Sequence, residues 1–389
     1  IRGPLFVEAM KRQKQGIDIL KLNTGNPATF GFGLPDSIKN ALMEHMQDGV
    51  GYCDFKGMPQ ARQAICDYET SKGINGITSD DVFIGNGVSE VVSFALTPLL
   101  NDGDEVLVPS PSYSLWGNSV YLEDGKPVFY TCDEQANWYP DIQDIRSKIT
   151  DKTKAIVIIN PNNPTGVLYP KELLLEIIQV ARESGLLIFA DEIYDRLVMD
   201  GKQHISLASL TEDVPVITLN GLSKSHCLCG YRCGWMVISG PRELTEDYRQ
   251  GIIQLTSLRL CANTMAQIVI PAALDDMDTP ASMVRPGGRI YEQREATVRE
   301  LEKIDGLSFV KNDAAFYVFP KLDVKKFNIT NDKQFAHDLL DATNILLVPG
   351  SGFDWKDPDH FRIVMLPQAD ILSDAIRRMG TFLDGYKQK

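Results

Sequence analysis

Short apolar runs recur in the chain before residue 240, and their pattern predicts buried strands. The clearest runs are Val106–Val108, Ala155–Ile159, Leu186–Ala190, Val216–Leu219 and Trp235–Ile238. Each run has the length of a strand and is apolar on both faces, as the buried strands of parallel sheets are. The runs therefore predict an α/β layer with parallel strands.

The segment between the second and third runs has the periodicity of a helix. Its apolar residues at helical spacing are Leu173, Ile177, Val180 and Ala181. Pro170 can open this helix and Gly185 follows it. The order strand, helix, strand supports the parallel arrangement.

The pattern changes after Gly288. A charged helix is predicted from about Tyr291 to Ile304. Strand-like runs follow at Leu307–Lys311, Phe316–Phe319, Ile345–Val348 and His360–Met365. Strands mixed with a terminal helix predict a separate, smaller α+β domain.

Composition and charge narrow the class of protein. The 389 residues are 43% hydrophobic and 23% charged, which is ordinary for a soluble globular protein and long enough for two domains. The net charge of −13 without a polybasic run argues against nucleic-acid partners, and no apolar run is long enough to span a membrane. Because the chain begins with Ile1 rather than Met, we expect residues to precede it, and nothing visible resembles a targeting segment.

The seven cysteines are odd in number and form no regular framework, which favours reduced thiols in the cytoplasm. Three of them, Cys227, Cys229 and Cys233, lie close to His226. Adjacent His226 and Cys227 would rarely bind one ion, and no CxxC pair exists, so we expect no metal site.

Two segments offer contacts for a flat, phosphorylated ligand. In Ile84-Gly85-Asn86-Gly87-Val88-Ser89-Glu90 the glycines permit a tight turn and Ser89 can cap a helix, whose first amides suit a phosphate. Taken alone, an ordinary capped turn explains this segment better. Tyr113, in Pro111-Ser112-Tyr113, can stack on a ring, and core packing is an equal alternative.

Two further segments lie at the carboxyl ends of predicted strands, where open α/β sheets bind ligands. Asn163 lies in the rigid loop Asn160-Pro161-Asn162-Asn163-Pro164-Thr165-Gly166 and can donate to a ligand. Asp191 follows the run Leu186–Ala190 and needs a partner if it is buried. A protonated pyridine nitrogen would serve, and a solvated Asp at the start of a loop is the alternative.

Two sets of cations complete the candidates. Lys224 follows the strand Val216–Leu219, and Arg232, flanked by glycines, comes eight positions later. This context suits a Schiff-base lysine beside a phosphate-binding arginine, although a surface lysine is the commoner case. Arg362 lies inside an apolar strand, where it needs an anion: a substrate carboxylate or an internal ion pair.

These six segments, in this order, resemble the fold type I aminotransferases of class I/II across nearly the whole chain. The resemblance also includes Asn23-Thr24-Gly25-Asn26-Pro27, Tyr52 with Gly57, and Val348-Pro349-Gly350. Within that group the chain is most similar to bacterial alanine (glutamate–pyruvate) aminotransferases. That closer similarity lies in residues 220–224, 259–263 and 286–289.

The resemblance implies an α/β fold and a cofactor, pyridoxal 5′-phosphate. We expect a large domain at residues 44–285, with a mostly parallel seven-stranded sheet flanked by helices. A small α+β domain is expected from both chain ends, 1–43 and 286–389. The implied catalytic residues are Lys224, which carries the cofactor and moves the proton, Asp191, which pairs with the pyridine nitrogen, and Tyr194.

The resemblance also assigns residues that hold the cofactor. Tyr194 and Asn163 hydrogen-bond the ring's phenolic oxygen, and Tyr113 stacks on the ring. The phosphate contacts are the Val88 and Ser89 amides, Ser223, Arg232 and Tyr52. Because Tyr52 is expected to reach across from a neighbouring subunit, the resemblance implies a homodimer.

Substrate binding is assigned in the same way. Arg362, Asn163 and the backbone near Gly25 are implied to hold the substrate α-carboxylate. One departure is Gly221, where many relatives have a second serine, so the exact role of Ser223 is in doubt. Arg259 and Arg289 are candidates for a second cation that binds the side-chain carboxylate of glutamate. The sequence agrees at least as well with positions facing the solvent.

The expected activity is ping-pong transamination between L-alanine or L-glutamate and the 2-oxo acids pyruvate and 2-oxoglutarate. Lys224 can act as a base only if its pKa is lowered, and we expect Arg232 and desolvation to lower it. The alternatives are a C–S lyase on the same scaffold, or an aminotransferase for aspartate, aromatic or branched amino acids. A pyridoxal-phosphate-binding regulator is disfavoured, because the residues before Asn23 are too few for a DNA-binding module. A nucleotide-binding protein is also disfavoured, because the GxGxxG motif that begins at Gly85 has Glu90 in place of its last glycine.

Overall fold

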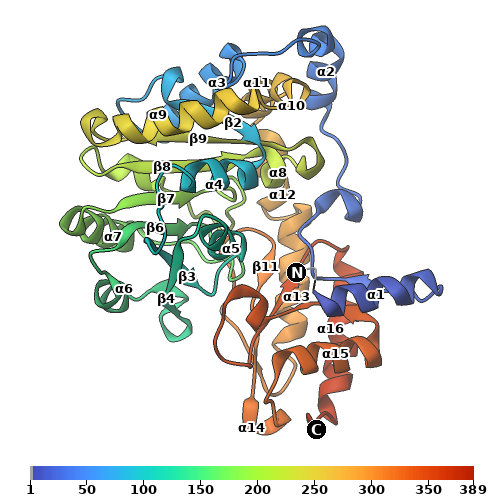
Figure 1. The fold of residues 1–389 in the computed structure, drawn as a ribbon. Coiled ribbons are helices and arrows are strands. Elements are labelled where there is room, and N and C mark those ends of the chain that lie inside the picture. The colour runs from blue at the N-terminus through green and yellow to red at the C-terminus, as the bar shows by residue number, and fades with distance from the viewer. Residues whose placement is uncertain (1–2) are drawn as a thin grey trace.

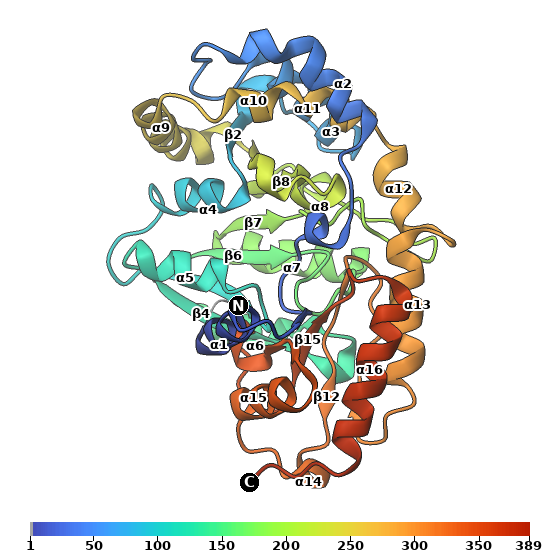
Figure 2. The same cartoon turned by 90° about the vertical axis from the view of Figure 1, so that its right-hand side faces the viewer.

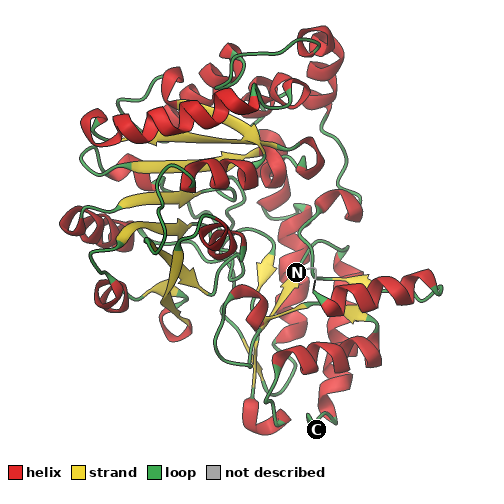
Figure 3. Ribbon diagram, viewed as in Figure 1, coloured by secondary structure: helices red, strands yellow, loops and turns green. Residues whose placement is uncertain are grey.

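An eight-stranded sheet forms the centre of the larger part of the molecule (Figures 1 and 3). The structure, a computed structural model, describes residues 3–389. The strand order is β2 (Val82–Asn86), β9 (Cys233–Ser239), β8 (Val216–Gly221), β7 (Leu187–Asp191), β6 (Thr153–Ile159), β3 (Glu105–Ser110), β4 (Lys126–Asp133) and β5 (Tyr139–Pro140). The predicted seven-stranded, mostly parallel sheet is present, and the two-residue β5 extends it at one edge.

One predicted strand runs in the opposite direction to the prediction. The run Trp235–Ile238 forms β9, which pairs antiparallel with both β8 and β2. The connection from β8 to β9 holds only the short helix α8 (Leu222–Ser225) and a 3₁₀ turn. Such a connection is too short for the helical crossover that parallel neighbours need, so the chain turns back antiparallel.

Helices cover both faces of the sheet because its central strands are apolar on both sides. Alternate residues of β6 face opposite ways: Val157 packs in one cluster with α4 (Val88–Leu96), α5 (Leu115–Leu122) and α9 (Arg242–Arg259). Ile156 and Ile158 pack in another with α6 (Ile142–Lys148) and α7 (Lys171–Ser184), the predicted helix. Near β2 and β9 lie α3 (Pro59–Ser71), α10 (Thr264–Ile268) and α11 (Ile270–Asp275).

The second group of elements lies below the large sheet in Figure 1, and Figure 2 shows its helices α13 (Arg289–Leu301) and α16 (Ala369–Asp384) side by side. A three-stranded sheet has the order β11 (Tyr317–Val318), β15 (Phe361–Val364) and β14 (Val348–Pro349). Two-stranded sheets join β1 (Leu20–Lys21) to β13 (Ile345–Leu346), and β10 (Leu307–Ser308) to β12 (Lys321–Leu322). The same group contains α1 (Pro4–Lys14), α14 (Val324–Phe327) and α15 (Asp332–Thr343), and α12 (Asp278–Val284) packs on α13. The helix α2 (Asp36–His45) lies instead at the opposite end of Figure 1, against α10 and α11.

The C-terminal predictions are largely reproduced, with one strand divided. The run Ile345–Val348 splits, because β13 pairs with β1 whereas β14 pairs with β15. Pairing of β1 with β13 brings the two chain ends into one unit. The first two residues of the predicted 1–43 segment lie outside the described part.

No single helix within residues 3–389 is long and apolar enough to cross a membrane. Only α9 taken together with the segment Thr264–Asp275 has the required length and composition, and the two are bent by 119°.

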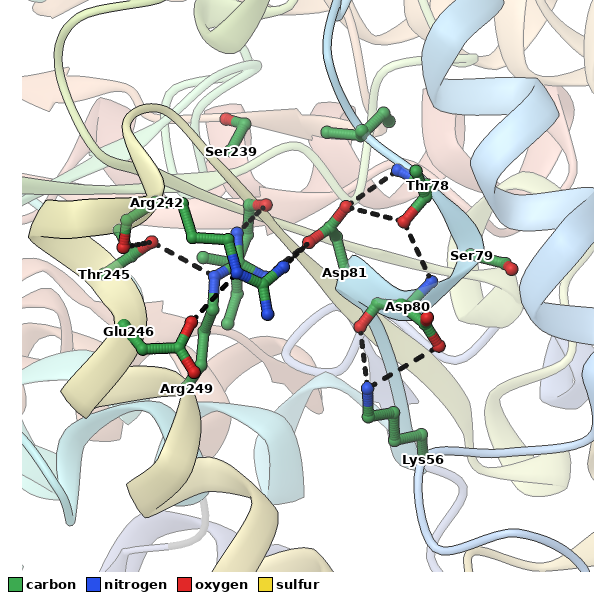
Figure 4. A network of polar contacts seen from close by, with 12 residues as sticks. Lys56, Thr78, Ser79, Asp80, Asp81, Ser239, Arg242, Thr245, Glu246 and Arg249 are labelled. Carbon is green, nitrogen blue, oxygen red and sulfur yellow. Dashed lines mark hydrogen bonds and ion pairs between the residues drawn. The ribbon is translucent and has the colours of Figure 1, made fainter.

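A buried ion pair fastens α9 to the edge of the large sheet (Figure 4). Arg249 Nη1 lies 2.5 Å from Asp81 Oδ1, and both residues are only 5% exposed. Asp81 Oδ2 also accepts hydrogen bonds from the Thr78 amide and hydroxyl. Arg249 donates to Thr245 Oγ1 and to the Ile238 carbonyl of β9. Every charged atom of this pair is therefore satisfied inside the protein.

Replacing Asp81 with alanine is expected to lower the free energy of unfolding by about 3–5 kcal/mol, because it leaves the buried Arg249 charge uncompensated. Urea unfolding followed by circular dichroism measures the change. The control is Asp80→Ala, since the Asp80 side chain is 76% exposed and pairs with Arg62 at 3.3 Å and with Lys56 at 3.7 Å. Ion pairs of such an exposed carboxylate contribute at most about 1 kcal/mol each. Equal losses from the two substitutions would contradict the interpretation.

Candidate active site

A cavity of about 560 Å³ lies at the carboxyl ends of the central strands, beside β11 and β15. It gathers nearly all the residues that the sequence predicted. These are Gly25, Val88, Ser89, Tyr113, Asn163, Asp191, Tyr194, Ser223, Lys224, Arg232 and Arg362. Tyr52 does not line the cavity, and its side chain is 85% exposed on the surface.

Lys224 reaches the cavity from α8, the short helix that follows β8. Its Nζ donates to the Gly25 carbonyl at 2.8 Å and lies 3.9 Å from Cys229 Sγ. Gly25 must be a glycine here, because a Cβ at this position would collide with the Tyr317 hydroxyl. The N-terminal segment thus closes over the lysine and holds its amine at one place.

The expected lowering of the Lys224 pKa is wrong for the free amine. Burial does lower this pKa, and Arg362 lowers it further. Interactions with Tyr317 and Cys229 outweigh both effects and leave the Lys224 pKa above its ordinary value. The guanidinium of Arg232 donates to the Cys229 carbonyl and to Ser89 Oγ rather than to a group beside the Lys224 amine.

Asp191 ends β7 with its carboxylate buried and without a basic partner. Oδ2 accepts a hydrogen bond from Trp116 Nε1 at 3.0 Å, and Oδ1 accepts one from the Ile193 amide at 3.4 Å. Burial raises the pKa of Asp191 to about 6, and the bond from Trp116 opposes this rise. Within residues 3–389 no lysine, arginine or histidine forms an ion pair with Asp191. The site therefore suits a cationic ligand atom.

Arg362 lies on β15 and is 2% exposed. Nη1 donates to Asn163 Oδ1 at 2.8 Å and Nη2 to the Asn23 carbonyl at 2.6 Å. The guanidinium lies between the rings of Tyr317 and Phe353, at 4.5 and 4.6 Å. No carboxylate of the described chain pairs with it, and its Nε has no partner there. The predicted alternative, that Arg362 forms an ion pair within the protein, is therefore not found among residues 3–389.

The loop and turn that follow β6 and β7 supply two more polar groups. Asn163 Oδ1 accepts a hydrogen bond from Arg362 Nη1, so the side-chain NH₂ of Asn163 can donate to a ligand. The Tyr194 hydroxyl lies 2.9 Å from the Tyr317 hydroxyl. Both tyrosines are buried, and both line the cavity.

The start of α4 is arranged to receive an anion. The helix begins at Val88 after Gly87 and has no side-chain cap, so the prediction that Ser89 caps it is wrong. Instead, Ser89 Oγ accepts a hydrogen bond from Arg232 Nη2 at 3.0 Å. The free amides of the first turn and the guanidinium of Arg232 together form a site for a phosphate.

The departure at Gly221 has a steric cause. A Cβ on Gly221 would lie 2.5 Å from the Cys233 carbonyl oxygen, because β8 and β9 approach closely there. A serine at position 221 does not fit unless these strands move apart. The packing of β8 against β9 therefore excludes a side-chain hydroxyl at this position.

Among the residues that contact the charged groups of the site, Trp116, Tyr317 and Phe353 were not predicted. Trp116 bonds Asp191, and the other two enclose Arg362. Tyr317 lies in the predicted strand Phe316–Phe319, but its role depends on contacts with residues more than 40 positions away in sequence. No local signal in the sequence marks any of the three as part of a site.

Comparison with known proteins agrees with this geometry. A family model described as "Aminotransferase class I and II" matches residues 17–376. The chain is 51% identical to the glutamate-pyruvate aminotransferase AlaA of Haemophilus influenzae over 100% of this chain and 96% of that protein. This chain belongs to the class I and II aminotransferase family.

Solved structures of aminotransferases share the whole fold. An aminotransferase from Escherichia coli superposes with a TM-score of 0.98 at 47% identity, covering 100% of this chain and 96% of the other. The alanine aminotransferase from Pyrococcus furiosus gives 0.93 at 41% identity, with coverage of 98% and 96%.

Enzymes of this family use pyridoxal 5′-phosphate, and it is the cofactor of this aminotransferase. The residues present fit it. The cavity offers an amine at Lys224, an unpaired carboxylate at Asp191 and an anion site at the start of α4. These three groups match the aldehyde, the pyridine nitrogen and the phosphate of that molecule.

Neither of the two additional arginines lines the cavity of this aminotransferase. Arg259 Nη1 is paired with Glu90 Oε2 at 2.6 Å, and Nη2 donates to two backbone carbonyls. Arg289 donates to the Phe30 carbonyl and stacks on Phe32 at 3.9 Å. Both arginines are half-buried and bonded within the protein, so the alternative that they face the solvent does not hold for either.

Proposed function

We propose that this aminotransferase moves the amino group between L-alanine or L-glutamate and the 2-oxo acids pyruvate and 2-oxoglutarate by a ping-pong mechanism. The observation that carries the proposal is Arg362, a buried guanidinium with which no carboxylate of residues 3–389 pairs, in the cavity that holds the Lys224 amine. Such a cation suits an α-carboxylate, which all these substrates share. The names of the AlaA and alanine aminotransferase relatives support the choice of substrates.

The same proposal assigns the residues that hold the cofactor. Bound pyridoxal phosphate supplies an electron sink for negative charge at the substrate α-carbon. Lys224 would hold it through its amine, and the carboxylate of Asp191 would face the pyridine nitrogen and favour its protonated form. Asn163 and Tyr194 bind the ring oxygen, and Tyr113, which is half-buried at the cavity wall, stacks on the ring.

The phosphate is assigned to the start of α4 and its neighbours. The amides of Val88 and Ser89 would donate to it, together with the hydroxyl of Ser223 and the guanidinium of Arg232. Tyr52 is assigned to the phosphate of a second subunit in a homodimer, which is supported by its 85% exposure and its absence from the cavity of its own chain.

Substrate binding and proton transfer follow from the positions of three groups. Arg362 binds the α-carboxylate through its Nη atoms, with Asn163 and the backbone at Gly25 beside it. The amine of Lys224 would accept the proton of the substrate α-carbon and hold it at Nζ. Because the pKa of the free amine is raised, Lys224 would have to lose a proton before it could act as this base.

Two broader assignments belong to the same proposal. The large domain spans 44–285, and the small domain combines 1–43 with 286–389, a division supported by the pairing of β1 with β13. A reducing, cytoplasmic setting is supported by seven cysteines that are all free.

Replacing Arg362 with methionine is expected to lower kcat/KM for L-alanine by about 10²–10³-fold, since it removes a desolvated, hydrogen-bonded charge from the carboxylate. The Tm of the cofactor-free protein is expected to stay unchanged or rise, because a buried cation without a counter-ion costs stability. Differential scanning calorimetry measures the Tm.

The matched control is Arg249→Met, the same substitution at a buried arginine that has a carboxylate partner. It should lower the Tm. If Arg362→Met lowers the Tm equally, Arg362 is a structural residue and the carboxylate assignment fails.

A survey of amino donors tests the reaction itself. Holoenzyme mixed with L-alanine or L-glutamate alone is expected to change its absorbance stoichiometrically and to release one equivalent of pyruvate or 2-oxoglutarate without ammonia. The second oxo acid should then restore the starting spectrum. Ammonia and pyruvate released from cysteine or cystathionine would instead establish the C–S lyase alternative.

A further inference from the structure

A lysine whose side chain is only 13% exposed lies beside the turn that carries Asp191. Lys72, at the carboxyl end of α3, places its Nζ 2.9 Å from Glu69, 2.8 Å from Glu192 and 3.0 Å from Asp195. The three carboxylates are 0%, 2% and 8% exposed. Two of them belong to the turn between Asp191 and Asp195, so this ammonium lies within the scaffold of the site rather than in its cavity.

The three carboxylates connect Lys72 to separate strands that support the site. Asp195 Oδ2 accepts from Asn220 Nδ2 at 2.7 Å, at the end of β8 and four residues before Lys224. Glu69 accepts from Trp235 Nε1 of β9 at 3.2 Å. One cation therefore holds together α3, the turn after β7, and the strands on either side of the lysine-bearing helix.

Further contacts fix the orientation of each carboxylate. Glu192 Oε1 accepts from the Ser206 hydroxyl and the Leu207 amide, at 2.9 and 3.0 Å. Asp195 also accepts from the Tyr68 hydroxyl at 2.6 Å. With both oxygens of Glu192 occupied, its charge has a fixed place one residue from Asp191.

The other titratable groups around this cluster are His204, Arg196 and Tyr68. His204 Nε2 lies 3.1 Å from the Asn160 carbonyl and 3.9 Å from Glu192, and burial lowers its pKa. The Arg196 guanidinium stacks on Tyr68 and donates to backbone carbonyls of α11. Glu192, Asp195 and His204 have the spacing of a cation site, and the ammonium of Lys72 lies among them.

The charge of Glu192 acts on Asp191. Burial raises the pKa of Asp191, and the negative charge of Glu192 raises this pKa further. Lys224 lowers it. With Lys72 neutral or absent, nothing adjacent to Glu192 except the uncharged His204 would balance that charge.

We propose that Lys72 is a positioning residue for transamination: by neutralising Glu192 and Asp195 it keeps the turn in place and keeps Asp191 negatively charged. The functional consequence rests on the role of Asp191 in the proposed function. The electrostatic coupling itself does not, because it belongs to the cofactor-free chain.

The coupling is measured by ¹⁹F NMR on cofactor-free protein labelled with 5-fluorotryptophan. Trp116 donates to Asp191, so its resonance, assigned by its loss in Trp116→Phe, follows the ionisation of that carboxylate. In the unmodified sequence the resonance should titrate near pH 6. In Lys72→Met the midpoint should move to higher pH by about one unit, and in Lys72→Arg it should stay near the starting value.

Two more variants separate charge from structure. Glu192→Gln alone should move the midpoint to lower pH, and the pair Lys72→Met with Glu192→Gln should restore it. Lys148→Met is the control. Lys148 forms an ion pair with Asp144, with 2.7 Å between Nζ and Oδ2, and neither residue lines the cavity. This substitution should leave the midpoint unchanged.

The proposal is overturned if the Trp116 midpoint is the same in Lys72→Met and Lys148→Met. It is overturned equally if Glu192→Gln, a variant that keeps Lys72 paired with two carboxylates, does not lower the midpoint. In holoenzyme the acidic limb of kcat/KM for L-alanine should move with the NMR midpoint. A shifted midpoint without a shifted limb would retain the coupling and reject the role of Asp191 in the proposed function.

Discussion

Replacing Lys224 with alanine is expected to lower the transamination of L-alanine with 2-oxoglutarate by at least about 10⁴-fold. A positioned acid–base group alone contributes about 10²–10⁴-fold, and Lys224 is also the only amine that lines the cavity within the described chain. Its Nζ donates a hydrogen bond to the Gly25 carbonyl at 2.8 Å. No other lysine of residues 3–389 lines the cavity and could replace it. Steady-state formation of pyruvate measures the loss.

Two controls distinguish the amine from its charge. Lys224→Arg keeps a cation in place, but a guanidinium neither joins an aldehyde nor gives up its proton near neutral pH. It should be as inactive as the alanine variant. Lys148→Ala should remain fully active, and undiminished turnover by Lys224→Ala would remove the assignment altogether.

Replacing Asp191 with asparagine is expected to lower kcat/KM by about 10²–10³-fold, a loss of about 3–4 kcal/mol in transition-state stabilisation. The substitution keeps the shape of the side chain and removes the charge that faces the pyridine nitrogen. It also replaces one acceptor, so the bond from Trp116 Nε1 survives only if the amide oxygen occupies the place of Oδ2.

A suitable control for this variant is Asp354→Asn. Burial raises the pKa of Asp354 as it does that of Asp191, but Asp354 does not line the cavity. Its substitution should leave kcat/KM within about twofold of the starting value, as for a residue without contact to the reacting groups. An unchanged kcat/KM for Asp191→Asn would argue against Asp191 as the partner of the pyridine nitrogen.

Much of the fold was determined by short segments of sequence. The apolar runs at 106–108, 155–159, 186–190 and 216–219 became β3, β6, β7 and β8, and the periodic segment after Pro170 became α7. These elements could be predicted because burial on both faces requires apolar residues at every position of a strand, a pattern visible without knowing any partner. The loops that follow those strands were predicted to carry the chemistry, and the structure brings them to one cavity.

The direction of β9 and the surroundings of Lys224 were decided only in three dimensions. An apolar run has the same composition whether its neighbours run parallel or antiparallel, so Trp235–Ile238 gave no sign of its direction. The pKa of Lys224 depends on Tyr317 and Arg362, which are distant in sequence and adjacent in space. Arg232 is close in sequence but directs its charge elsewhere.

The sequence by itself determined which residue types this protein places at the ends of its strands, and hence that an amine, a carboxylate and two guanidinium groups are available for one ligand. Only the tertiary structure decided which of these charges are paired. Arg249 and Arg362 are both buried arginines, yet one meets Asp81 and the other meets no carboxylate of the described chain. The physical reason is that burial and pairing of a charge depend on the distances to groups from other elements, and the chain order does not contain those distances.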